Sequence, residues 1–102
     1  MYMAIRRYRL PKEKLNDVVT KTENEGLPVF EKIPGFIDYY YLYSDGFVTV
    51  VNVYESRESA ELSSRTAAEW VQKNIPGAYA GPPEIISGEV LLYRHGKLRA
   101  AA

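Results

Sequence analysis

Three side chains in otherwise apolar segments could bind a small molecule. Arg6 and Arg7 are neighbours in an extended segment, so their side chains point to opposite faces and one arginine faces inward. An inward guanidinium could bind a carboxylate, a phenolate or an anionic intermediate. Asn52 interrupts an apolar run and could orient a substrate or a dioxygen-derived group, and the Trp70 indole could stack on a flat aromatic molecule. The sequence therefore predicts Arg6, Asn52 and Trp70 as substrate-binding residues, and it identifies no catalytic residue.

Each of these three residues also has a purely structural explanation. Trp70 lies on the apolar stripe of a predicted helix, where a core aromatic residue is the commoner case. A buried arginine needs a charged partner, which Glu89 on the last predicted strand or Asp38 on the second could supply. Asn52 could form a buried hydrogen bond at the centre of a dimer. For Trp70, and for an inward arginine paired with Glu89, the structural explanation carries more weight than substrate binding. For Asn52 the two explanations carry equal weight.

Other candidate residues carry weaker signals. His95, the single histidine of the chain, is the residue type best suited to general-base catalysis near neutral pH, but it follows the last predicted strand without a visible partner. Gly88 could mark a β-bulge or the close approach of a ligand, and we favour the bulge. Hydroxyl donors could come from three of the nine tyrosines, namely Tyr8, Tyr40 and Tyr54.

The composition argues against several classes of function. The chain has no cysteine, which excludes disulfides, thiolate nucleophiles and cysteine-ligated metals. No cluster of His, Asp and Glu has metal-ligand spacing and no Gly-rich phosphate loop is present, so we predict neither a metal nor a cofactor. The 13 Lys and Arg balance the 13 Asp and Glu, which disfavours nucleic-acid binding. No secretion signal or membrane span is recognisable, so we expect a cytoplasmic protein without a membrane partner.

The pattern of apolar residues predicts elements in the order βαββαβ. This order is typical of a ferredoxin-like α+β fold with a four-stranded antiparallel sheet. Residues 1–95 are expected to form a single domain, and residues 96–102 a disordered tail. Strands are predicted at 2–9, 36–43, 47–54 and 84–94, and helices from Pro11 to a stop at Gly26, over a short turn at 27–33, and from a cap at Ser56 to about Ile75.

The predicted strands carry apolar residues on both faces of the sheet. Two helices can cover only one face, and the other would expose an apolar patch far larger than the few hundred Å² typical of a monomer. A second copy of the chain is the simplest partner, so we expect a homodimer. In the second strand, the two faces are expected to carry Ile37, Tyr39, Tyr41 and Tyr43 on one side and Phe36, Tyr40 and Leu42 on the other.

Several segments resemble the dimeric α/β-barrel superfamily and, within it, proteins of the antibiotic-biosynthesis-monooxygenase type. The resemblance runs from residue 1 to about residue 93 and marks the fold better than the reaction. It rests on AIRRY near the start, Pro34-Gly35-Phe36, the strand 51–55 followed by Ser56-Arg57-Glu58, the segment 67–71, and Pro82-Pro83-Glu84 with Gly88-Glu89-Val90.

The resemblance implies two sheets that face each other in a dimer, with a pocket between helices and sheet in each subunit. Some members of the family oxidise aromatic polyketides or quinols with dioxygen and no cofactor. Others degrade haem with an Asn on the first strand and a Trp and a His on the second long helix. Trp70 resembles that Trp, but Arg6 and Arg7 stand where the Asn would fall and no His follows on the helix, so haem degradation is not expected.

The implied function is therefore that of a small-molecule-binding protein resembling cofactor-independent monooxygenases, with an aromatic, quinol-like or small hydrophobic ligand. Two alternatives remain open, because a fold likeness does not fix a reaction. One is a module that binds a ligand without turnover, and the other is a structural dimer whose interior is filled by its own side chains.

Overall fold

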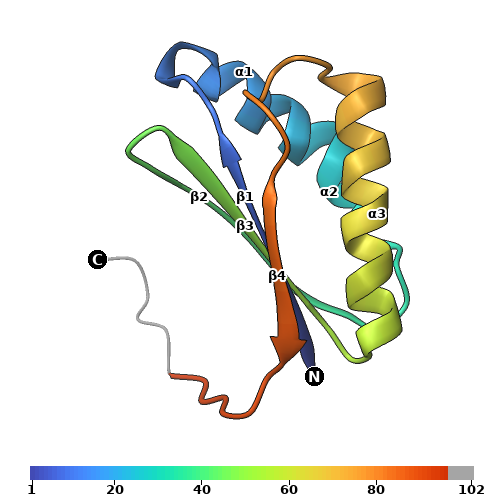
Figure 1. Cartoon of the computed structure of the whole chain (residues 1–102). Coiled ribbons are helices and arrows are strands. Elements are labelled where there is room, and N and C mark those ends of the chain that lie inside the picture. Colours follow the sequence, from blue (N-terminus) through green and yellow to red (C-terminus); the bar gives the residue numbers. More distant parts are fainter. Residues whose placement is uncertain (97–102) are drawn as a thin grey trace.

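Four antiparallel strands form one sheet in the spatial order β2-β3-β1-β4. They are β1 (Tyr2–Arg9), β2 (Phe36–Ser44), β3 (Phe47–Tyr54) and β4 (Glu84–Glu89). The structure is a computed structural model that describes residues 1–96, so residues 97–102 of the predicted tail lie outside the described residues. Figure 1 shows the helices together on one face of the sheet. The predicted ferredoxin-like α+β fold is confirmed.

The first helical segment does not stop at Gly26, contrary to the sequence-based expectation. It runs through a 3₁₀ turn, η1 (Lys12–Lys14), α1 (Leu15–Lys21), a π-helical turn, η2 (Thr22–Gly26), and α2 (Leu27–Glu31). Gly26 has helical backbone angles, with φ −82° and ψ −51°. A Cβ at this position would lie 3.2 Å from Cζ2 of Trp70, so the glycine permits close packing against the indole and does not end the helix.

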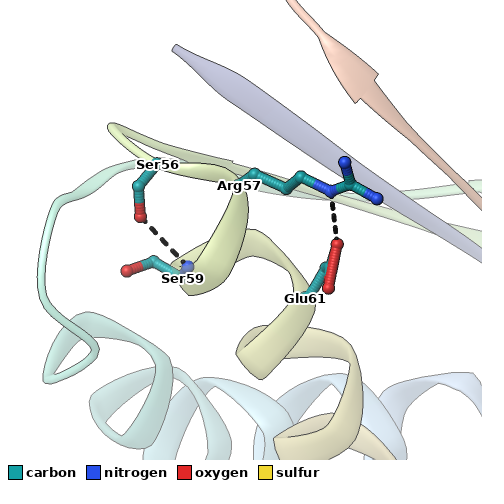
Figure 2. Close-up of polar contacts among 4 residues, drawn as sticks. All are labelled: Ser56, Arg57, Ser59 and Glu61. Atoms are coloured by element: carbon teal, nitrogen blue, oxygen red, sulfur yellow. Dashed lines mark hydrogen bonds and ion pairs between the residues drawn. The ribbon is translucent and has the colours of Figure 1, made fainter.

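The second long helix, α3 (Arg57–Asn74), begins as the sequence predicts. The Ser56 Oγ accepts a hydrogen bond of 3.1 Å from the Ser59 backbone N–H, as Figure 2 shows, and this bond satisfies one of the free donors of the first turn. The inward face of α3 carries the small buried residues Ala60, Ser63 and Ala67, so the helix axis lies close to the sheet.

Strand alternation places Arg6 and Asn52 on the helix-covered face of the sheet. Arg6 is buried and Arg7 is exposed on the opposite face. Asn52 pairs in register with Ala4 of β1 and Tyr39 of β2, both of which belong to the core. Arg6 and Asn52 therefore lie beneath the helices.

One β-bulge changes the predicted faces of β2. The register skips Ile37 between Phe36 and Asp38, so Phe36 lies on the same face as Tyr39 and packs edge-on against Tyr54 at a centroid distance of 5.8 Å. The predicted assignment of Phe36 to the opposite face is wrong for this reason. The bulge expected at Gly88 is also wrong, because Gly88 pairs regularly with Met3.

β4 ends at Glu89, five residues earlier than predicted. Glu89 lies opposite Tyr2, the first residue of β1, and the Val90 N–H still donates to the Met1 carbonyl at 3.0 Å. Leu91 and Leu92 follow β4 and are exposed, Leu92 by 95%.

Within residues 1–96, no helix is long and apolar enough to cross a bilayer.

We expect Ser56→Ala to lower the free energy of unfolding by about 1 kcal/mol, because the substitution removes the acceptor for the Ser59 N–H. Ser59→Ala is the matched control, since it changes a neighbouring serine and leaves that N–H in place. Urea denaturation followed by circular dichroism compares the two variants with the parent chain. Equal losses in the two variants would contradict the capping role of Ser56.

Candidate functional site

A cavity of about 370 Å³ lies between α3, the β1–β4 edge of the sheet and the connection from α3 to β4. Its wall contains both aliphatic and aromatic residues and one cationic side chain, Arg6. The residues that line it are Arg6, Tyr8, Ser64, Ala68, Val71, Gln72, Pro76, Gly77, Tyr79, Gly81, Pro82, Pro83 and Ile85.

Arg6 is the charged group of this cavity, and its side chain is almost entirely buried, with 1% exposure. Its Nη2 donates to Asn52 Oδ1, and its Nη1 lies 3.5 Å from Ser63 Oγ and 3.4 Å from Ser64 Oγ. The guanidinium carbon lies 5.4 Å from the centre of the Phe30 ring. All of these partners are neutral.

Within residues 1–96, no carboxylate lies within 4 Å of an Arg6 nitrogen. The predicted pair between the inward arginine and Glu89 is wrong because the inward arginine, Arg6, lies opposite Ile85 in the β1–β4 register, whereas Glu89 lies opposite Tyr2. The cross-strand ion pair is made instead by Arg7 with Glu84, at 3.8 Å and in partly exposed positions. The alternative partner, Asp38, lies opposite Val53 on the far side of β3.

The cluster around Arg6 has more hydrogen-bond donors than acceptors. In the described part of the chain, Arg6 Nε and Asn52 Nδ2 are buried donors without an acceptor. Ser63 Oγ donates to the Ala60 carbonyl at 2.6 Å, which leaves its lone pairs toward Arg6. The cavity therefore borders a buried cation whose cluster offers more hydrogen-bond donors than acceptors.

Asn52 contacts Arg6 but does not line the cavity. It is completely buried on the helix-covered face, so its hydrogen bond does not lie on the open face, where a dimer centre would be. The role that this geometry supports is to hold one side of the guanidinium in place.

Trp70 likewise does not line the 370 Å³ cavity. Its indole packs against Gly26 and borders a separate void of about 20 Å³ in the core. This packing agrees with the interpretation of Trp70 as an aromatic residue of the core.

Stacked tyrosines supply the aromatic wall of the cavity. The rings of Tyr8 and Tyr79 lie 4.1 Å apart at 22°, and the Tyr79 hydroxyl lies 2.9 Å from the Tyr41 hydroxyl. Of the three tyrosines singled out in the sequence, only Tyr8 lines the cavity. Tyr54 donates to the Phe30 carbonyl at 3.2 Å, and Tyr40 is 55% exposed on the other face.

Sequence reasoning did not identify Tyr79 or Ser64 as site residues. Tyr79 lies in the α3–β4 connection, between turn residues that predict no regular element, and Ser64 is one of several small residues on α3. A weak signal existed in Gly81-Pro82-Pro83, which marks a fixed turn beside the start of β4.

Burial raises the pKa of the interior tyrosines Tyr8, Tyr39, Tyr41 and Tyr79, and it raises the pKa of Tyr54 to about 12. The positive charge of Arg6 opposes the rise at Tyr8, Tyr39 and Tyr54 but is the smaller effect. At neutral pH these side chains are therefore uncharged hydrogen-bond donors and not bases.

A general base is not found among the residues that line the cavity, which include no Asp, Glu or His. His95 is exposed, and its Nδ1 lies 3.3 Å from the Tyr93 hydroxyl. Within residues 1–96, no group of three His, Asp or Glu side chains could hold a metal ion.

The buried tyrosines predict a loss of stability in alkaline solution. A tyrosine with a higher pKa in the folded chain contributes stability that is complete below the unfolded pKa of about 10 and is lost as the pH rises toward the folded pKa. For Tyr54 this window runs from the ordinary tyrosine pKa of 10.0 to about 12. There it should lower the free energy of unfolding by about 1.4 kcal/mol per pH unit.

Urea denaturation at a series of alkaline pH values, with tyrosinate absorbance recorded in parallel, measures this loss. Tyr54→Phe should make the pH dependence less steep than that of the parent chain. A free energy of unfolding that stays constant through this window would contradict the assignment.

Comparison with known proteins supports the fold. Neither a protein-family model nor a curated protein matches the sequence. Among solved structures, a candidate antibiotic biosynthesis monooxygenase of Bordetella bronchiseptica is similar with a TM-score of 0.72 and 17% identity, covering 89% of this chain and 97% of that one.

Two further similar structures hold ligands. The ActVA-Orf6 monooxygenase of Streptomyces coelicolor, in complex with nanaomycin D, has a TM-score of 0.67 and 16% identity over 97% of this chain and 92% of that chain. The haem degrader MhuD of Mycobacterium tuberculosis, with two haems in its active site, has a TM-score of 0.71 and 17% identity over 93% of this chain and all of that chain. At these identities the likeness concerns the fold. The chain has the ferredoxin-like fold of the antibiotic-biosynthesis-monooxygenase-like proteins, which confirms at the level of fold the resemblance seen in its sequence.

Proposed function

We propose that this protein binds a small aromatic or quinol-like molecule in the Arg6 cavity, in the manner of cofactor-independent monooxygenases. The observation that carries the proposal is a buried arginine at the wall of a 370 Å³ cavity, with no carboxylate partner in the part of the chain that the structure describes. This volume lies within the range of roughly 300–1,000 Å³ that is typical of small-molecule sites. The Tyr8–Tyr79 stack supplies a flat surface for an aromatic ring.

Arg6 would stabilise negative charge that develops on the bound molecule. A phenol or an anthrone becomes more reactive toward dioxygen once it has lost a proton, and a fixed guanidinium favours that anion. The net oxidation converts a CH₂ group to a carbonyl, with one oxygen atom from dioxygen retained and the other released as water. The substrate supplies all four electrons, so this reaction needs no external reductant.

The second candidate is a protein that binds such a ligand without turnover. The absence of Asp, Glu and His from the cavity lining favours it, because no described side chain there could remove the proton. The neutral tyrosines would hold a ligand through hydrogen bonds but would not act as bases. Substrate binding at Asn52 and Trp70 is a weaker element of either proposal, since neither lines the cavity.

Ala68→Trp should abolish binding of aromatic ligands, because the indole would fill the cavity from α3. Arg65→Trp, at an exposed position of the same helix, is the matched control and should bind as the parent chain does. Calorimetric titration with a panel of quinols and anthrones measures binding. Undiminished binding in Ala68→Trp would show that this cavity is not the site.

Oxygen consumption with the same panel separates the two candidates. Uptake by the parent chain that is lost in Ala68→Trp would support the monooxygenase. Binding without oxygen consumption for every compound would contradict the monooxygenase. Ligand binding without turnover would then be the remaining function.

We further propose that a second copy of the chain covers the open face of the sheet. The helices pack on one face only (Figure 1), and large apolar side chains on the other remain exposed, among them Tyr40 (55%), Leu42 (48%) and Ile86 (65%). Covering these residues would remove apolar surface from water at about 25 cal/mol per Å².

Sedimentation at micromolar concentration should therefore give a dimer for the parent chain and a monomer for Leu42→Glu, because the interface would bury the new charge. Val29→Glu is the control, since Val29 is also partly exposed but lies on α2, on the covered side. A parent chain that sediments as a monomer would refute the second copy.

A further inference from the structure

We infer that the ligand of the Arg6 cavity is an aromatic oxyanion, a flat molecule with one carboxylate or one ionised hydroxyl, whose oxygen binds beside Arg6 Nη1 and Ser64. This inference rests on the proposed function and goes further by assigning the charge of the ligand and the end of the cavity at which that charge lies.

The distribution of carboxylates among the arginines is the first observation. Arg7 and Arg57 are exposed, where a partner is least needed, yet each has a carboxylate, at 3.8 Å and 2.6 Å. Arg6 is buried, where a guanidinium cannot lose its charge and its desolvation is costly, yet its described partners are all neutral. A bound anion would supply the missing charge.

The position of the guanidinium is the second observation. Asn52 Oδ1 holds Nη2 from the β3 side, away from the cavity. On the α3 side, Nη1 has only long contacts of 3.5 and 3.4 Å to the Ser63 and Ser64 hydroxyls. Arg6 and Ser64 both line the cavity, so the side of the guanidinium with the long contacts is the side that faces the cavity wall formed with Ser64.

The remainder of the wall limits the ligand to one charge. Among the described residues that line the cavity, Arg6 is the single cation, and no other charged side chain is present. Most of the surface comes from Ala68, Val71, the prolines, Ile85 and the stacked tyrosines, which suit a ring and not a second anionic group. A phosphate ester carries two negative charges, and the wall holds no second cation to pair with the second charge.

Calorimetric titration with two matched pairs of compounds tests the inference. 2-Naphthoate and 2-naphthamide share a ring and a size but differ in charge, and 2-hydroxy-1,4-naphthoquinone, which is ionised at neutral pH, is compared with its methyl ether. We expect each anion to bind about tenfold to a hundredfold more tightly than its neutral partner, as expected for a charge-assisted hydrogen bond. A preference confined to one pair distinguishes the carboxylate from the ionised hydroxyl.

Arg6→Met should remove the preference for the anion while retaining binding of 2-naphthamide. Arg7→Met, on the opposite face of β1, is the control and should keep the preference. If Arg6→Met does not fold, the melting temperature of the parent chain serves instead, since the anion should raise it more than an equal concentration of the amide does.

The inference about charge and the proposed function are contradicted by different results. If 2-naphthamide binds as tightly as 2-naphthoate, and the quinone ether as tightly as the quinone, the inference about charge is wrong and the cavity remains a ligand site. If none of the four compounds and no member of the quinol and anthrone panel binds, the proposed function falls together with the inference.

Discussion

The guanidinium of Arg6 lies where three elements of the fold meet, and the arrangement of the interior depends on it. Arg6 comes from β1, Asn52 from β3 beside it, and Ser63 and Ser64 from α3 above it. Because a guanidinium presents its N–H groups in fixed directions within a plane, acceptors are needed at particular places around it. Ser63 provides one such acceptor on a helix face that otherwise carries the buried alanines Ala60 and Ala67.

The close approach of the helices to the sheet is what allows a cavity to form next to this charge. Small residues on α3 bring that helix near Arg6, and Gly26 leaves room for the Trp70 indole between α3 and the first helical segment. The connection between α3 and β4 then borders the cavity with Tyr79 and Pro82. The polar cluster and the cavity therefore result from one packing arrangement, in which Trp70 fills space away from the cavity.

The two faces of the sheet carry different kinds of residues because the helices cover only one of them. The covered face holds the arginine, the asparagine and the tyrosines whose pKa values burial raises. The open face carries Met3, Ile5 and Ile86 around a groove that continues to Leu91 and Leu92. An apolar surface of this kind is suited to association, whereas the buried polar groups of the chain lie on the helix side.

The sequence by itself determined what depends on neighbours in the chain. The periods of two and 3.6 residues predicted the order of elements, and a serine before the helix predicted the Ser56 cap, since these signals are local. Alternation established that one of Arg6 and Arg7 faces inward, but only the packing of α3 decided that it is Arg6. Register, which links distant segments, decided the absence of the Glu89 pair and the early end of β4 opposite Tyr2. The cavity likewise required Tyr8, Ser64 and Tyr79 to converge from a strand, a helix and a loop. No local pattern encodes such convergence, because it depends on how side chains far apart in the chain fill space together.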